Sequence, residues 1–273
     1  VYYNENVYRI SDKTHCYKEI MQTGVEALGD ITEYNLLEVM GLAVKSLQTV
    51  SENSVLNLSH LGLLKEALSG IEGDEHRSLI VEALRNKNRH ELESVLEKAE
   101  APEASSKFLK YMASAFGNPS EVLNGLQKYA SSENVKQCMA VLKKITDNIS
   151  SFGNIKVRID LSLAGDMNYY NGLIFEGYVE GIPQAVLKGG QYDSLLKKLN
   201  KKGGAIGFAV YLDELERLKA GSGYDVDVLL IAGPEVPYET VIAKTNELIA
   251  AGRTVSVQKT PAKNLIYKEM VEL

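Results

Sequence analysis

The sequence predicts an α+β fold in which an antiparallel sheet carries helices on one side. Strand-like segments stand on both sides of an almost wholly helical block between Asp74 and Ser150. The strands, helix and hairpin that follow do not alternate regularly as βαβ units do. A short strand–helix–strand unit ends the chain. We therefore expect a split core of residues 1–70 and 151–222, a helical insertion of residues 71–150, and a partial C-terminal α/β domain of residues 224–273.

The first half of the core is predicted from two strands and a helix. Tyr2–Arg9 is rich in residues that favour strands, and Lys18–Gly29 alternates between two faces. One face of this second strand carries Gln22, Gly24 and Glu26, so we expect it to line a surface rather than to enter a core. Apolar residues then recur at helical spacing up to Val50.

The helical block is predicted as a bundle of four or five short helices. It follows a short strand at Val55–Ser59 and a short helix at His60–Leu68. Its clearest member is the segment Val135–Ile149, in which apolar residues trace one face. The simplest interpretation is a solvated bundle, and a surface for a partner is the alternative.

Strands return after Ser150. Ile155–Leu161 alternates cleanly, and LIFEGYVEGIPQAVLKGG predicts a hairpin with its turn at Gly181–Pro183. Ala205–Val210 is predicted as a buried strand. Tyr192–Leu199 and Leu212–Leu218 are predicted as helices.

The C-terminal segment is predicted as one βαβ unit. A linker at Gly221–Gly223 precedes the strand DVDVLLIAG, a helix at Tyr238–Ala251 and the strand TVSVQ. A further helix is expected to start near Pro261.

Composition limits the functions that the chain can have. The net charge of −6 argues against a bulk electrostatic grip on nucleic acid. The two cysteines, Cys16 and Cys138, and the four histidines form no metal-like spacing, so we expect no metal site and a reduced, cytoplasmic location. No membrane span or signal peptide is predicted. The chain starts without methionine, so we treat it as a candidate fragment with an upstream segment missing.

Four motifs in order carry a resemblance to histidyl-tRNA synthetases over residues 1 to about 220. VYRISDKTHCYKEIMQTGVEALG resembles the second motif of class II synthetases, and AIGFAVYLDEL resembles the third, whose usual form is AVGFALGLERL. GDMNYYNGLIFEGYV and VLKGGQYDSLL resemble the two histidine-specific signatures, RGLDYYNRTVFEWV and GGRYDGL. The resemblance implies a class II synthetase-like antiparallel sheet with flanking helices. It also implies a homodimer core.

The resemblance also implies a histidine-binding pocket. By position in the motifs, the residues that would hold histidine are Gln22, Glu26, Tyr169, Tyr170 and Tyr192. Their carboxylate, amide and hydroxyl groups suit an imidazole and an amino group. The plainer alternatives are a solvated face for the first two residues and ordinary strand positions for the adjacent tyrosines.

Four departures from the family pattern predict that the chain does not activate histidine. Family arginines are replaced by Gly165, Gln191 and Glu214. Ser11 stands where the family has the acidic partner of Arg9. Arg9 would be a vestigial ATP-site residue or a structural surface residue. Without these cations the charge of ATP is not stabilised, so we expect no catalytic residues.

This pattern of loss and retention resembles the regulatory subunits of short-form ATP phosphoribosyltransferase. That resemblance implies a non-catalytic protein that joins the catalytic subunit in a hetero-octamer, activates it and takes part in feedback by L-histidine. It implies no cofactor. Histidine could bind the pocket or the subunit interface. The alternatives are a divergent histidyl-tRNA synthetase, or a synthetase-like module for nucleic acid or kinase regulation, although the acidic balance makes tRNA binding a weaker prediction.

Overall fold

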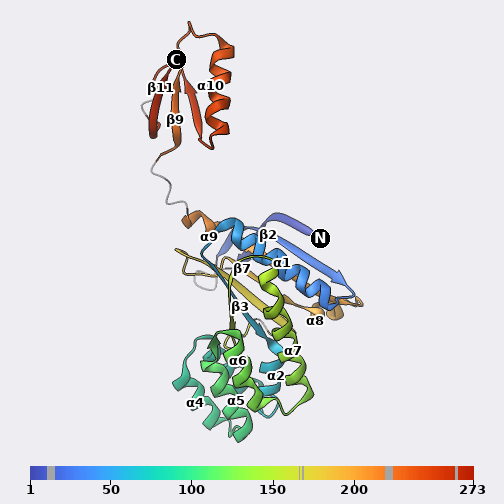
Figure 1. The fold of residues 1–273 in the computed structure, drawn as a ribbon. Helices are drawn as coiled ribbons and strands as arrows, with labels where there is room; N and C mark the ends of the chain where they lie inside the picture. Colours follow the sequence, from blue (N-terminus) through green and yellow to red (C-terminus); the bar gives the residue numbers. More distant parts are fainter. Residues whose placement is uncertain (11–15, 166, 168, 219–223, 262–263) are drawn as a thin grey trace. The chain divides into compact units, whose positions relative to one another are not determined.

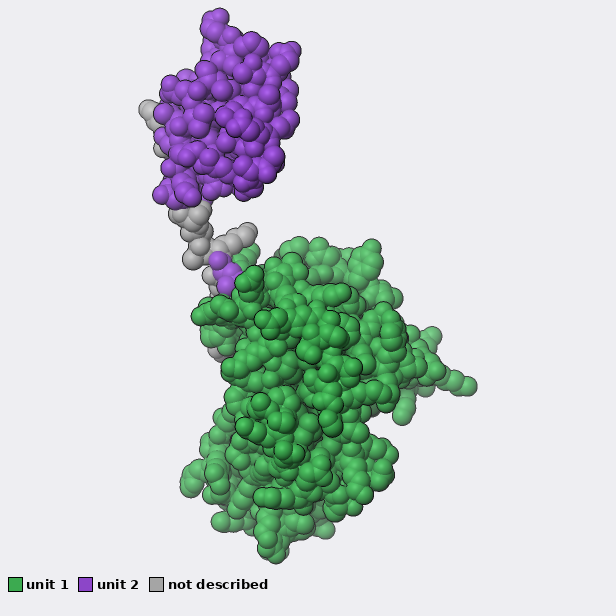
Figure 2. All heavy atoms as spheres, in the orientation of Figure 1, with its two compact units in different colours: residues 1–216 green, residues 217–273 purple. Residues whose placement is uncertain are grey.

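The structure is a computed structural model that describes residues 1–10, 16–165, 167, 169–218, 224–261 and 264–273. It divides the chain into two compact units, Val1–Glu216 and Arg217–Leu273 (Figure 2). The predicted linker Gly221–Gly223 lies outside the described residues. No helix in the described ranges is long and apolar enough to cross a membrane.

The first unit is built on an eight-stranded sheet (Figure 1). Its order is β1-β2-β8-β7-β6-β3-β5-β4, and every neighbouring pair is antiparallel except β3 and β5. The strands are β1 Tyr2–Ile10, β2 Tyr17–Gly29, β3 Ser54–His60, β4 Phe116–Gly117, β5 Lys156–Asp160, β6 Leu173–Val179, β7 Leu187–Gln191 and β8 Gly204–Tyr211. The predicted hairpin is confirmed as β6 and β7.

The two faces of this sheet have different roles. On one face Thr23, Val210, Leu187 and Gly177 lie in register, and the Leu47 side chain of helix α1 (Glu33–Val50) fills the space beside Gly177. Because successive residues of a strand point to opposite faces, their neighbours along each strand point away from α1. That second face is where the cavity described below lies.

The helical insertion packs on the sheet through a continuous apolar core. Between Asp74 and Asn148, all of which the structure describes, lie five α-helices, within the predicted number. Their buried leucines, valines and isoleucines join those of α1 and the sheet in one cluster. The remaining helices of this unit and the short 3-10 helices are α2 Leu61–Ala67, α3 Asp74–Arg85, α4 Arg89–Lys98, α5 Glu103–Ser114, α6 Pro119–Leu126, α7 Glu133–Asn148, α8 Asp193–Lys198, α9 Leu212–Leu215, η1 Gln127–Tyr129, η2 Ile149–Ser151 and η3 Glu216–Leu218. The predicted α+β class II arrangement is confirmed.

His60 links β3 to the first turn of α2 and makes the fold sensitive to acid. Its Nδ1 accepts a hydrogen bond from the backbone N–H of Gly62 at 3.1 Å, which caps the helix. Burial lowers the pKa of His60 from 6.5 to about 4, and the charge of Lys65 adds to the shift. The unfolded chain therefore takes up this proton near pH 6.5, whereas the folded chain does so only near pH 4.

We expect the free energy of unfolding to fall by up to about 3 kcal/mol from this residue alone as the pH drops through that window. Replacing His60→Asn keeps a capping acceptor and removes the titration. Urea unfolding of both proteins at a series of pH values measures the difference. Parallel pH profiles for the two proteins would contradict this role for His60.

The second unit is a small three-stranded parallel sheet with one helix. The strand order is β10-β9-β11, in which β9 is Val226–Ile231, β10 is Val255–Gln258 and β11 is Tyr267–Glu272, and α10 spans Tyr238–Ala250. The predicted βαβ unit is confirmed. The helix expected near Pro261 is wrong, because YKEMVE instead pairs with β9 as a third strand.

Candidate functional site

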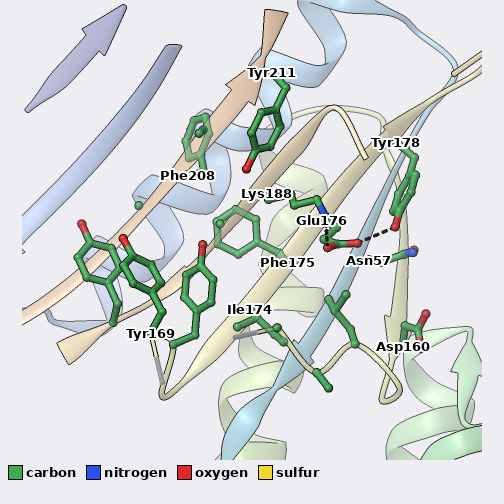
Figure 3. A pocket seen from close by; sticks show the side chains of 18 of the residues that line it. Asn57, Asp160, Tyr169, Ile174, Phe175, Glu176, Tyr178, Lys188, Phe208 and Tyr211 are labelled. Carbon is green, nitrogen blue, oxygen red and sulfur yellow. Dashed lines mark hydrogen bonds and ion pairs between the residues drawn. The ribbon is translucent and has the colours of Figure 1, made fainter. Parts of the chain in front are cut away.

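A cavity of about 810 Å³ lies over the sheet face that points away from α1 (Figure 3). Two rows of residues in register run along its floor. The first row is Glu26, Gly207, Gly190 and Ile174, and the second is Gly24, Ala209, Lys188, Glu176 and Asn57. All of them except Gly190 and Gly24 line the cavity. The strand register therefore brings together side chains that are far apart in the sequence.

All six residues predicted for ligand contacts line this cavity. Gln22 and Glu26 come from β2, Arg9 comes from β1, and the three tyrosines come from the segment around β6 and β7. The set is Arg9, Gln22, Glu26, Tyr169, Tyr170 and Tyr192. Gly165, where the resemblance puts a family arginine, lines the same cavity.

Glu26 is the acidic group at one end of the cavity. The Tyr192 hydroxyl donates a hydrogen bond to its Oε2. Burial raises the pKa of Glu26, while the hydrogen bond from Tyr192 partly opposes the shift. The pKa of Tyr192 is also raised, chiefly by burial and then by its bond to Glu26. A half-buried carboxylate that already accepts one hydrogen bond from a hydroxyl can accept further hydrogen bonds from a cationic ligand.

The tyrosines form an aromatic wall beside this carboxylate. The ring centroids of Tyr169 and Tyr170 are 4.6 Å apart and nearly perpendicular, and those of Tyr169 and Tyr192 are 5.2 Å apart and nearly parallel. Burial is the largest cause of the raised pKa of Tyr169 and of Tyr170. These hydroxyls therefore stay protonated at neutral pH and remain able to donate hydrogen bonds.

Gln22 presents an acceptor that needs a partner. Its side chain is buried, with only 5% of its surface exposed. The amide nitrogen donates to the Tyr3 hydroxyl at 3.0 Å. The Oε1 atom is buried without a hydrogen-bond partner among the described residues. Such an orphaned acceptor is costly, so a ligand donor at this position would be favourable.

Two glycines on the cavity floor make room for these side chains. A Cβ atom at Gly207 would clash with the Glu26 carboxylate and the Val25 carbonyl, and one at Gly190 would clash with the ring of Tyr170 and the Leu173 carbonyl. A Cβ atom at the preceding residue, Gly189, would clash with the ring of Phe175 and the Gly207 carbonyl.

Two other positions that depart from the family pattern, Gln191 and Glu214, do not line the cavity. Gln191 donates from its amide to Asp193 at 2.9 Å, and Glu214 is half-buried on α9. Neither is among the described residues that line the cavity. Ser11 lies outside the described residues.

Sequence reasoning missed several cavity residues. Tyr211 lies opposite Gln22 in the strand register, whereas Tyr3 lies opposite Gly24 and accepts the hydrogen bond from Gln22. Lys188 and Glu176 pair in the middle of the floor at 3.2 Å. Arg85 and Lys87 reach the cavity from the end of α3. The alternation of Tyr3 with Arg9 along β1 could have indicated the first of these. No local pattern marks the others, because their position depends on strand order and on helix packing. No group of three or more potential metal ligands occurs in the described part of the chain.

The fold defines a class II synthetase-like protein, and its sheet carries a cavity lined by acidic, basic and aromatic side chains. The sequence model of the family described as histidyl-tRNA synthetase matches residues 1–215, so the chain belongs to that family. This agrees with the resemblance carried by the four motifs.

Within the family, the chain is similar to proteins named ATP phosphoribosyltransferase regulatory subunit. It is 29% identical to the one from Caldanaerobacter subterraneus over 93% of this chain and 69% of the relative. It is 30% identical to the one from Carboxydothermus hydrogenoformans over 75% of this chain and 63% of the relative. The chain spans 52% of a third such relative, from Oceanobacillus iheyensis. The expected resemblance to these regulatory subunits is confirmed.

Solved structures give the same result. A protein described as ATP phosphoribosyltransferase regulatory subunit/histidyl-tRNA synthetase from Bacillus halodurans superposes with a TM-score of 0.71 at 25% identity, covering 99% of this chain and 72% of that one. Histidyl-tRNA synthetase from Nostoc superposes with a TM-score of 0.70 at 14% identity, covering 96% of this chain and 66% of that one, and so supports the fold alone.

Proposed function

We propose that the chain is a non-catalytic regulatory subunit of a short-form ATP phosphoribosyltransferase. It would activate the catalytic subunit and take part in histidine feedback. The names of its relatives support this assignment. The observation that carries it is one cavity that keeps the acidic and aromatic groups of an amino-acid pocket while Gly165 takes the place of a family arginine.

The absence of catalysis follows from the charges that adenylation needs. Glycine at position 165 offers no donor to the charge that develops when a carboxylate attacks ATP. At the third-motif position, Glu214 would repel a phosphate. Arg9 is kept at its motif position, but the family arginines at positions 165, 191 and 214 are not. The proposed adenylation defect is therefore electrostatic.

Histidine is the proposed effector, bound by Gln22, Glu26, Tyr169, Tyr170 and Tyr192. The Oε1 atom of Gln22 and the carboxylate of Glu26 are acceptors, and histidine offers an ammonium group and an imidazole N–H as donors. If histidine binds one assembly state better than another, it shifts the equilibrium by that difference in affinity. This linkage gives feedback without chemistry at the pocket.

The assembly itself belongs to the proposal. The partner would be the short catalytic subunit in a cytoplasmic hetero-oligomer, and the synthetase-like part would form a homodimer. Co-expression with a short-form catalytic subunit, followed by co-purification, tests the association. Its transferase rate with and without this chain, each with and without histidine, tests activation and feedback. We expect a faster rate with the chain and inhibition by histidine, whereas failure to associate would count against the assignment.

A divergent histidyl-tRNA synthetase is the second candidate, because the chain belongs to that family and Arg9 still lines the cavity. Histidine-dependent exchange of ATP and pyrophosphate separates the two candidates. We expect no exchange above background, since the arginines of three motif positions are missing. Robust exchange would favour the synthetase.

A further inference from the structure

The cavity continues well past the groups proposed to hold histidine. Figure 3 shows Tyr169 at one end of the row of lining side chains and Asp160 at the other. Glu26 lies on β2 and Glu176 on β6, three strands away in the sheet, and Asn57 lies on β3, four strands away. Strands are spaced about 4.8 Å apart, so these separations are about 14 and 19 Å.

A single histidine does not fill this length. The path from its imidazole nitrogen to its carboxylate oxygen is six bonds of about 1.5 Å, so it reaches at most about 9 Å. The cavity volume of about 810 Å³ also lies in the upper part of the range for pockets that hold drug-sized molecules, roughly 300–1,000 Å³. A second ligand, or a second group, has room in the far part.

We name this far part the basic end and define it by Asn57, Arg85, Lys87, Asp160, Glu176 and Lys188, all of which line the cavity. It has three cationic groups and two carboxylates. The sheet supplies Asn57, Asp160, Glu176 and Lys188, while Arg85 and Lys87 come from the helical insertion. The basic end is therefore a junction between the two.

Both carboxylates of the basic end already have partners. Asp160 is buried, its Oδ2 pairs with Lys87 at 2.9 Å, and its Oδ1 accepts from the backbone N–H and hydroxyl of Ser162. Glu176 pairs through Oε1 with Lys188 at 3.2 Å and accepts through Oε2 from the Tyr178 hydroxyl at 2.6 Å (Figure 3). Each oxygen of the two carboxylates therefore already accepts a hydrogen bond or ion pair, so these groups have little capacity left to bind a ligand.

The cations, by contrast, have donors to spare. An ammonium group carries three N–H donors and a guanidinium carries five. Lys87 and Lys188 each use one donor in their ion pairs, and Arg85 donates through Nη2 to the Gly165 carbonyl at 2.9 Å. The remaining donors at this end suit an acceptor group with negative charge.

One acceptor on the floor also lacks a partner. The Oδ1 atom of Asn57 is buried without a hydrogen bond among the described residues. The terminal torsion of asparagine is soft, so a small rotation presents this atom to the cavity. A ligand hydroxyl or N–H beside the anionic group would meet it.

We propose that the basic end binds the carboxylate or phosphate group of a small-molecule ligand other than the histidine held at Glu26. The ligand would bridge the sheet to the helical insertion, since its anionic group would contact Lys188 on one side and Arg85 and Lys87 on the other. This inference goes beyond the proposed function and does not depend on histidine binding.

Calorimetric titration of the 273-residue chain with inorganic phosphate and, in a second arm, with malonate tests the proposal and distinguishes the two kinds of anion. We expect saturable binding of at least one probe. Lys188→Gln and Arg85→Gln should each weaken it tenfold or more. The matched control is Lys201→Gln, which alters an exposed lysine that does not line the cavity.

Several results would overturn the proposal. They are no binding of either probe, equal affinity for wild type and both basic-end variants, an equal loss in the Lys201→Gln control, or displacement of the probe by saturating histidine. Arg85 is exposed, so its variant remains informative if Lys188→Gln unfolds. Binding of a probe without any binding of histidine would uphold this proposal while contradicting the proposed histidine pocket.

Discussion

Replacing Gly207→Ala is expected to close the pocket and to destabilise the core sheet together. The added Cβ would meet the Glu26 carboxylate, which can move, and the Val25 carbonyl of the neighbouring strand, which cannot move without shifting β2. Overpacking of this kind costs about 1–3 kcal/mol of the free energy of unfolding. Histidine affinity should fall below detection, because the carboxylate is pushed from its place beside Tyr192.

Thermal unfolding followed by circular dichroism and calorimetric titration with histidine measure both effects. The control is Gly233→Ala, since a Cβ atom there meets nothing within 4 Å. Its unfolding free energy should change by no more than about 0.5 kcal/mol. A Gly207→Ala protein with the wild-type melting temperature and affinity would show that the strand has room for a side chain, against the packing described here.

The parts of the fold that local pattern determines were predictable. The hairpin of β6 and β7 follows from two alternating segments around a turn at Gly181–Pro183, and α7 follows from apolar spacing between Val135 and Ile149. The error near Pro261 arose where a long-range contact decides the outcome. The segment Tyr267–Glu272 becomes a strand because β9 offers it a partner, and no local pattern requires that pairing.

The pocket divides in the same way. Gln22, Glu26 and the tyrosines stand within motifs that resemble those of histidyl-tRNA synthetases, and this resemblance identifies them from the sequence. Lys188 and Glu176 were not predicted, because they meet only through the antiparallel register of β6 and β7. Arg85 was not predicted because its reach to Gly165 depends on how α3 packs beside the sheet. Sequence therefore predicts the end that resembles a known family, and the basic end emerges from tertiary structure.

Glu26→Gln should separate ligand binding from stability. The neutral amide keeps the shape of the side chain but removes the charge that would hold the ammonium or imidazole donors of histidine. Hydrogen bonds to charged groups contribute about 1.5–3 kcal/mol, so the affinity should fall roughly ten- to hundredfold. The matched control is Glu19→Gln, an exposed carboxylate on the same strand.

The direction of the pKa shift of Glu26 predicts how the stability and the histidine affinity of the chain depend on pH. Burial raises the pKa of Glu26 above its ordinary value. At a pH above that ordinary pKa, the ionised carboxylate therefore destabilises the folded chain. The variant should therefore unfold at a temperature no lower than the wild type at neutral pH.

Wild-type affinity for histidine should also fall as the pH drops through the raised pKa of Glu26, and the variant should lack that part of the decline. Calorimetry at several pH values compares the two proteins, so that the titration of histidine itself cancels. Unchanged affinity in the variant would show that histidine binds elsewhere, and the subunit interface would then become the place to look for the feedback site.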